Sequence, residues 1–226
     1  MLHLILSALV LFFPSNEIIV NRRTFLTSNI AANMYKSINY KNEEPEPIKP
    51  PENNEGTENS LIGIYDNNIY FSGPITDESI FALTSHILNL QQNNPSINLY
   101  LQSNGGSLLP TLGVVDLIKG GDVPINTYVN GYAASAATLI SVVGATRFMN
   151  NHGVLLIHQL KMGLGYGKYE EIKDYSENAN TLMNIIKKIY LENTNLDMST
   201  LNYLLTHDLW LNSTVCKKYG IIDIIY

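Results

Sequence analysis

The sequence predicts an α/β fold. Short runs of aliphatic and β-branched residues alternate with stretches whose apolar residues recur at helical spacing, and glycine or proline separates them. The connections between these runs are short, as in folds whose helices pack against a sheet. Hydrophobic residues make up 45% of the 226 positions and charged residues 15%, a composition typical of a globular protein. We therefore expect one α/β domain with a substantial core.

Four short strands are predicted in the central part of the chain. They lie at residues 69–72, 97–102, 125–129 and 154–157. Gly73 and Pro74 break the chain after the first strand, and the last strand leads directly into His158. The repeated order of a strand followed by a helix is typical of the α/β class.

Helices are predicted between these strands and after the last one. The first carries apolar residues at Ile80, Leu83, Ile87 and Leu90. The second is predicted at 108–119, where two glycines stop it, and an alanine-rich run extends to Val143. A long amphipathic helix is predicted from about Lys168 to Asn193. Its apolar side carries Ile172, Leu182, Ile185, Ile186 and Ile189.

The N-terminal part differs in character from the rest. An apolar run over residues 1–13 has the length of a signal-peptide hydrophobic region and is too short for a stable membrane span. We interpret residues 1–40 as a targeting extension, organellar (plastid or mitochondrial) or secretory; the alternative is a poorly ordered N-terminus on a cytoplasmic protein. Residues 41–60 alternate proline with glutamate, which predicts a disordered linker. The folded domain is expected at 61–226.

Charge and cysteine content exclude several functions. The net charge is −6 and no cluster of lysine and arginine stands out, so nucleic acid is not expected as a main partner. The single cysteine, Cys216, excludes an internal disulfide and a multi-cysteine metal site, and is expected to be a small buried hydrophobe.

Residues 131–137 read G-Y-A-A-S-A-A at the end of a predicted strand. The glycine turns the chain and small residues open a helix, so Ser135 would lie at a helix N-terminus, where negative charge is favoured. Its small neighbours would let a substrate backbone approach. Ser135 could then be a nucleophile, or simply the N-cap of a tightly packed helix.

Two further motifs could support such a serine. Asn104-Gly105-Gly106-Ser107 follows a strand, and its backbone N–H groups could form an oxyanion hole or an anion nest, or just a strand-to-helix turn. His158 is held by the strand before it and could act as a general base, or be a hydrogen-bonded core histidine. The positions of the other histidines, His3, His86, His152 and His207, give less support for a role as the general base. An acid that orients the base could be Asp197, Asp208 or Asp223, and the residues alone do not choose among them.

In this order and spacing, the motifs resemble the proteolytic subunit of the ATP-dependent Clp protease (ClpP) family over about residues 69–225. N-G-G-S matches the family's P-G-G-S, Y-A-A-S matches M-A-A-S, and L-I-H-Q matches M-I-H-Q. Near the C-terminus, D-L-W-L at 208–211 leads to Y-G-I-I-D at 219–223, as in the family. The resemblance implies a catalytic triad of Ser135, His158 and Asp208. It also implies an oxyanion hole formed by the N–H groups of Gly105 or Gly106 and of Ala136.

The resemblance also implies the fold, the activity and the partners. The fold would be the ClpP/crotonase-like fold of repeated ββα units, with the long helix as a protruding handle and residues 162–167 as the strand and hinge before it. The activity would be that of a serine endopeptidase that hydrolyses unfolded polypeptides inside an oligomeric chamber, as part of protein quality control, and it would need no metal and no organic cofactor. The chain would self-assemble into stacked heptameric rings and work with an AAA+ Clp unfoldase, which uses the ATP.

Several positions depart from the family pattern and indicate a divergent member. Leu160 replaces the proline that usually follows H-Q, and Ala136 replaces the methionine after the nucleophile. Residues 61–66 stand where the family has its pore-shaping segment. The alternative functions are a catalytically inactive Clp-like ring subunit, which the complete triad disfavours, and a crotonase-like acyl-CoA enzyme, which needs no Ser–His pair. No lysine lies in a motif that suggests a Ser–Lys peptidase.

Overall fold

The computed structural model describes residues 60–163 and 167–226. The predicted targeting extension, nearly all of the predicted linker, and residues 164–166 of the predicted hinge lie outside the described residues. Everything below concerns the described part of the chain.

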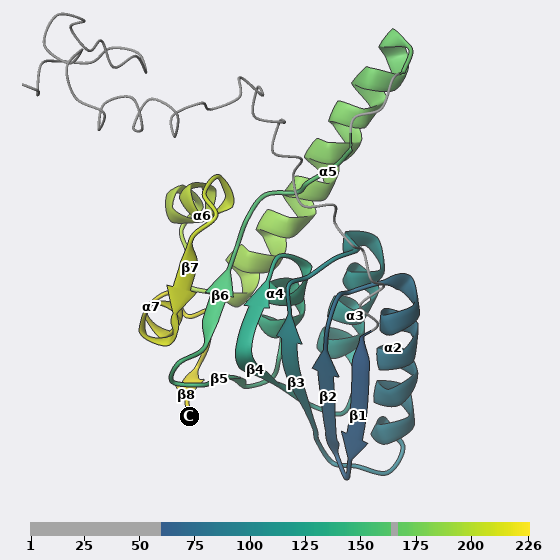
Figure 1. Cartoon of the computed structure of the whole chain (residues 1–226), viewed down its shortest axis with the longest axis vertical. Helices are drawn as coiled ribbons and strands as arrows, with labels where there is room; N and C mark the ends of the chain where they lie inside the picture. Colours follow the sequence, from purple (N-terminus) through teal and green to yellow (C-terminus); the bar gives the residue numbers. More distant parts are fainter. Residues whose placement is uncertain (1–59, 164–166) are drawn as a thin grey trace, which may run out of the picture. The chain divides into compact units, whose positions relative to one another are not determined.

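The described residues form one mixed sheet of eight strands in the order β1-β2-β3-β4-β5-β8, with β6 beside β4 and β7 beside β6 (Figure 1). The strands are β1 (Leu61–Tyr65), β2 (Asn68–Ser72), β3 (Ile97–Ser103), β4 (Ile125–Ala134), β5 (Arg147–Met149), β6 (Val154–Leu156), β7 (Trp210–Asn212) and β8 (Ile224–Ile225). Pairing is parallel from β2 through β5 to β8, whereas β1 and β7 are antiparallel to their neighbours. The predicted α/β class is confirmed.

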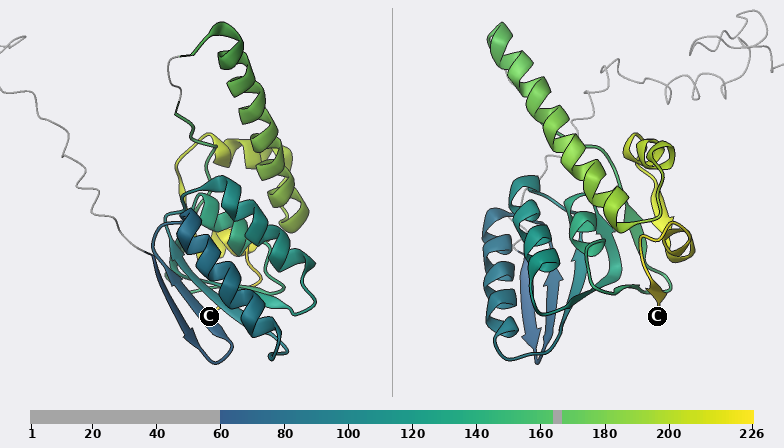
Figure 2. Two further views of the ribbon diagram at one scale, coloured as in Figure 1. Left: turned by 90° about the vertical axis from the view of Figure 1, so that its right-hand side faces the viewer. Right: turned by 180° about the vertical axis from the view of Figure 1, so that it is seen from behind.

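Helices cover one face of this sheet, as Figure 2 shows. The helices of the described residues are α2 (Asp77–Gln91), α3 (Leu108–Gly120), α4 (Ala136–Ser141), α5 (Tyr169–Asn193), α6 (Met198–Leu205) and α7 (Ser213–Lys218). Thr76 fixes the start of α2, because its hydroxyl accepts from the Ser79 N–H and the Ser79 hydroxyl accepts from the Thr76 N–H.

Strand β3 alternates buried with partly exposed residues, so Leu99 and Leu101 belong to the core.

The opposite face of the sheet carries an aromatic row. Tyr70, Tyr100, Tyr128 and Phe148 occupy paired positions on four adjacent strands, and their rings stack with centroids 4.6, 4.4 and 4.3 Å apart. Two residues earlier, the amides of Asn68, Asn98 and Asn126 form a hydrogen-bonded chain across three of the strands. These cross-strand pairs fix the parallel register on the face that the helices leave uncovered.

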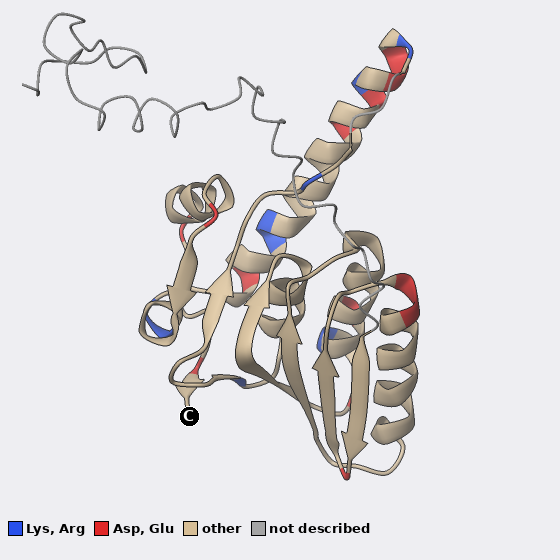
Figure 3. Cartoon of the chain, viewed as in Figure 1, with Lys and Arg blue, Asp and Glu red and all other residues tan. Residues whose placement is uncertain are grey.

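Helix α5 extends well beyond the sheet and its helices (Figure 1). Only its C-terminal half packs on the domain: Ile186 and Ile189 are buried there, although Ile185 is 37% exposed, whereas Ile172 in the N-terminal half is 51% exposed. The apolar side of α5, which the sequence predicts as one continuous stripe, therefore has a part buried against the domain and a part exposed to solvent. Charged residues of both signs lie along α5, and few lie on the sheet (Figure 3). Among the described helices, none combines the length and the hydropathy that crossing a membrane requires.

Some predicted boundaries were wrong. Strand β4 continues past residue 129 to Ala134, and residues 61–65, expected as a remnant of a pore segment, form a strand that pairs with β2. Met162, Gly163 and Gly167 lie in no strand, so the strand predicted before the long helix is absent from the described part of 162–167.

Candidate active site

Ser135 lies at the junction of β4 and α4 in a backbone conformation that few residues adopt. Its φ is 57° and its ψ is −129°, and Asp66 is the one other described non-glycine residue with positive φ. The Ser135 N–H donates to Leu156 O over 3.0 Å, which ties this turn to β6. The hydroxyl makes no capping hydrogen bond, so the helix-cap interpretation is not supported. A strained turn whose serine hydroxyl does not cap the helix is the arrangement seen where serine is presented as a nucleophile.

Gly105 and Gly106 are required beside this turn by close packing. A Cβ on Gly105, at φ 90°, would lie 2.7 Å from Ser135 Cβ and 2.9 Å from Ala136 N. A Cβ on Gly106, at φ 150°, would lie 2.0 Å from Ile75 O. Both contacts are far shorter than real Cβ contacts, and both φ values favour glycine. The Gly-Gly pair therefore lets the chain after β3 lie directly against the serine turn.

The N–H groups at this junction are not equivalent. The Gly105 N–H donates to the buried Ser103 hydroxyl over 3.0 Å. Within the described residues the Gly106 N–H donates to no protein acceptor. Ala136 is the first residue of α4, where an N–H group has no acceptor within the helix. Of the two glycines that the sequence left open, Gly106 has the available donor.

His158 follows β6, and the segment before β7 brings Asp208 beside it. Strands β6 and β7 pair antiparallel, and the Gln159 N–H donates to Leu205 O over 2.7 Å just beyond the strands. His158 Nδ1 and Asp208 Oδ1 are 3.5 Å apart, with the histidine side chain 26% exposed and the aspartate side chain 80% exposed. An imidazole with a carboxylate at Nδ1 can keep Nε2 free to accept a proton.

The other two candidate aspartates are engaged elsewhere. Asp197 caps α6, where its Oδ1 accepts from the Thr200 N–H over 2.8 Å, and this hydrogen bond lowers the pKa of the Asp197 carboxyl. Asp223 pairs with Arg147, which donates from Nε over 2.9 Å and from Nη2 as well. The structure therefore brings Asp208, and neither of these, to the histidine.

Two of the remaining histidines also have other surroundings. The ring of His207 stacks on Tyr203 at 4.3 Å, and its Nδ1 lies 2.7 Å from Tyr203 O. His152 is exposed in a turn. Cys216 is buried, as predicted, and this burial raises the pKa of its thiol to about 12.

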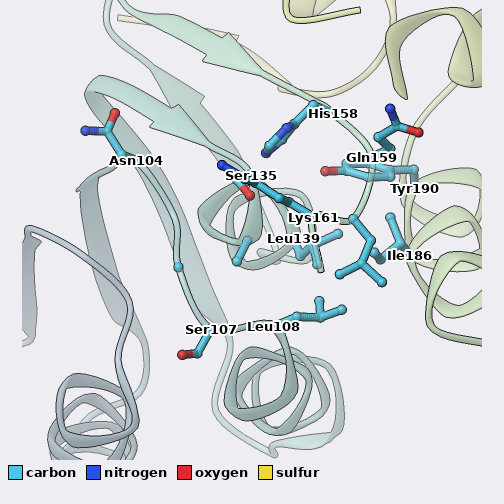
Figure 4. Close-up of a pocket in the computed structure, with 13 residues that line it drawn as sticks. Asn104, Ser107, Leu108, Ser135, Leu139, His158, Gln159, Lys161, Ile186 and Tyr190 are labelled. Atoms are coloured by element: carbon cyan, nitrogen blue, oxygen red, sulfur yellow. The ribbon is translucent and has the colours of Figure 1, made fainter. Parts of the chain in front are cut away.

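Ser135 and His158 line one pocket of about 420 Å³ (Figure 4). Its remaining lining residues are Asn104, Gly106, Ser107, Leu108, Ala136, Leu139, Gln159, Leu160, Lys161, Ile186 and Tyr190. Apolar side chains from α3, α4 and α5 thus form much of the wall opposite the two candidate catalytic residues. A peptide side chain of moderate size would fit such a space.

The sequence did not identify the part of this wall that α5 contributes. Ile186 and Tyr190 are one helical turn apart on α5, and both face the domain. The Tyr190 and Thr138 hydroxyls are hydrogen-bonded to each other, and burial raises the pKa of Tyr190 far above its ordinary value. The one sequence signal for this part of the wall was a hydrophobic stripe that contains a tyrosine. Such a stripe is as typical of a helix packed in the core as of a helix that lines a pocket.

Comparison with known proteins agrees with this fold and identifies the family. The Clp protease family matches residues 57–226. A relative from Streptococcus sanguinis (strain SK36), named ATP-dependent Clp protease proteolytic subunit, is 31% identical over 163 residues, which cover 70% of this chain and 83% of the relative. The fold is that of ClpP, and the chain belongs to the Clp protease family.

Proposed function

We propose that this protein is a serine endopeptidase in which Ser135 is the nucleophile, His158 the general base and Asp208 the acid that orients it. One observation carries the proposal: Ser135, on a positive-φ turn, lines the same pocket as His158, whose Nδ1 is 3.5 Å from Asp208 Oδ1. Membership of a protease family supports the reaction type.

The proposed reaction is acyl transfer in two steps. Ser135 Oγ attacks the peptide carbonyl while His158 Nε2 accepts the hydroxyl proton, and the N–H groups of Gly106 and Ala136 stabilise the oxyanion. His158 then gives the proton to the leaving amine, and the C–N bond breaks. In the second step His158 accepts a proton from water, the resulting hydroxide attacks the acyl ester, and Ser135 Oγ leaves with the proton from His158.

The proposal extends to assembly and partners. Helix α5 exposes three large apolar or aromatic side chains in its N-terminal half, Tyr169, Ile172 and Tyr175, and a fourth, Ile185, in the half that packs on the domain. A second copy would cover them, which supports self-assembly into the stacked heptameric rings of a closed chamber. The relative's name describes an ATP-dependent protease, so we propose that an AAA+ Clp unfoldase delivers unfolded polypeptides to this chamber. Residues 61–226 would be the peptidase domain.

The experiment that tests this function is hydrolysis of an unfolded, fluorescently labelled protein by the purified full chain. We expect Ser135→Ala to lower the rate by at least about 10³-fold, because no nucleophile remains. Ser85→Ala is the matched control, because the Ser85 hydroxyl donates to Phe81 O on the exposed side of α2. Equal rates for Ser135→Ala and the wild type would contradict the proposal, and an inactive wild type that still forms rings would favour the inactive ring subunit.

A further inference from the structure

Lys161 places a cation in the candidate active-site pocket. It lies three residues after His158 and lines the same pocket as Ser135 (Figure 4). In the sequence it follows Leu160, the position where this chain already departs from the H-Q-P pattern of the family. The segment that carries Lys161 is anchored at its start, because the Gln159 N–H donates to Leu205 O.

No acidic residue of the pocket neutralises this cation. None of the lining residues is aspartate or glutamate, and apart from His158 the lining residue that can carry a charge at neutral pH is Lys161. Within residues 60–163 and 167–226, Lys161 forms no ion pair, whereas Lys119, Lys173 and Lys188 each have a glutamate partner. The Lys161 ammonium is therefore available to an anion that enters the pocket.

The rest of the pocket defines the kind of anion. Leu108, Leu139 and Ile186 give it apolar walls, which favour methylene groups over a compact hydrated ion. A glutamate side chain has two methylene groups to contact such walls and a carboxylate to meet the ammonium at their edge. A glutamine side chain has nearly the same size and shape but no charge, so it serves as the uncharged control.

We propose that Lys161 gives this peptidase a preference for glutamate as the residue whose carbonyl is attacked. The inference rests on the proposed function, because it concerns the substrate of the Ser135 site. Lys161 is a specificity residue in this account and takes no part in proton transfer. Since an ion pair at the rim of a pocket is partly hydrated, we expect a modest effect, roughly 3- to 10-fold in kcat/KM.

The test uses peptidyl-aminocoumarins that differ in one residue, the one joined to the coumarin, so that the cleaved bond is fixed. The measured quantity is the ratio of kcat/KM for the glutamate peptide to kcat/KM for the glutamine peptide. We expect a ratio of roughly 3 to 10 in the wild type, a similar ratio in Lys161→Arg, and a ratio near one in Lys161→Met. The wild-type ratio should also fall in about 0.5 M salt, because salt screens partly exposed charges.

Lys188→Met is the matched control, because it removes the same charge from a lysine that pairs with Glu192 on α5 and does not line the pocket. It should keep the wild-type ratio. A wild-type ratio near one, or a ratio that Lys161→Met leaves unchanged, would overturn the inference while the proposed function stands. Loss of all hydrolysis in both Lys161 variants would also overturn it, because the lysine would then act in catalysis. If no peptide is cleaved in a Ser135-dependent manner, the proposed function itself fails.

Discussion

His158 Nδ1 lies 3.5 Å from Asp208 Oδ1, and both residues lie at the same end of a short antiparallel strand pair, His158 after β6 and Asp208 before β7. The distance is longer than that of a tight charge-assisted hydrogen bond, about 2.8 Å. The carboxylate is also 80% exposed, so solvent screens its interaction with the imidazole. In the proposed triad, Asp208 would therefore orient the histidine from an exposed position.

This geometry predicts a partial loss of activity when Asp208 becomes neutral. Asp208→Asn should lower kcat/KM roughly 10- to 10³-fold, less than removal of a fully buried triad acid, because water can partly replace an exposed carboxylate. Thermal unfolding should hardly change. Asp197→Asn is the control, since asparagine is an equally good N-cap for α6 and should preserve both activity and stability. An Asp208→Asn enzyme as active as the wild type would remove Asp208 from the triad.

The contact between Gly105 and the serine turn predicts opposite effects for two Gly→Ala substitutions. Gly105→Ala would push a methyl group against Ser135 Cβ and Ala136 N at a φ of 90°, so activity should be lost and stability lowered by more than about 1 kcal/mol. Gly113 lies within α3 with nothing within 4 Å of an added Cβ, so Gly113→Ala should raise the free energy of unfolding by about 0.5–1 kcal/mol. Urea denaturation and peptide hydrolysis measure both effects. An active Gly105→Ala enzyme would show that the serine turn can shift.

The ion pair between Asp223 and Arg147 predicts a pH-dependent contribution to stability. Hydrogen bonds from Arg147 lower the pKa of the Asp223 carboxyl. A carboxyl whose pKa is lowered by folding stabilises the native state at pH values above its pKa in the unfolded chain, which is near 3.9. This contribution disappears as the pH falls through the pKa of the folded state. Because the Asp223 side chain is 38% exposed, Asp223→Asn should cost only about 0.5–1 kcal/mol at pH 7. The difference between variant and wild type should vanish at the lowest pH at which the wild type stays folded; a constant difference would contradict the assignment.

Helix α5 predicts different outcomes for charges at its two ends. Ile172 is 51% exposed, so Ile172→Asp should leave the subunit folded and split the assembled particle by placing a charge where we propose that a second copy packs. Ile189 is buried in its own subunit at 9% exposure, so Ile189→Asp should unfold it. Circular dichroism reports folding and light scattering reports particle size. A folded Ile172→Asp protein of full size would place the assembly contact elsewhere.

The sequence predicted the parts of the fold that have strong local patterns. Strands β2 and β3 and helices α2 and α5 have clear periodicity, and the structure places them within a few residues of the predicted bounds. Strands β5, β7 and β8 have two or three residues each, too few to show any period. Their pairing depends on contacts between distant segments, which a local pattern does not contain.

The same reason limited what the residues alone could say about the site. Choosing among three aspartates required family resemblance, because Asp208 reaches His158 through the pairing of β6 with β7. Choosing between the two glycines required the position of the Ser103 hydroxyl, which engages the Gly105 N–H. The division of α5 into a packed half and an exposed half follows from where the sheet ends, and the helical period is the same in both halves.

The most direct test of the account is covalent labelling of the full chain with a fluorophosphonate, followed by mass spectrometry of the digested protein. Fluorophosphonates react with serines that a general base activates, so we expect one phosphonylated residue, Ser135. Labelling should be absent in Ser135→Ala and strongly reduced in His158→Ala. Labelling at another serine, or undiminished labelling of the Ser135→Ala protein, would show that Ser135 is not the nucleophile.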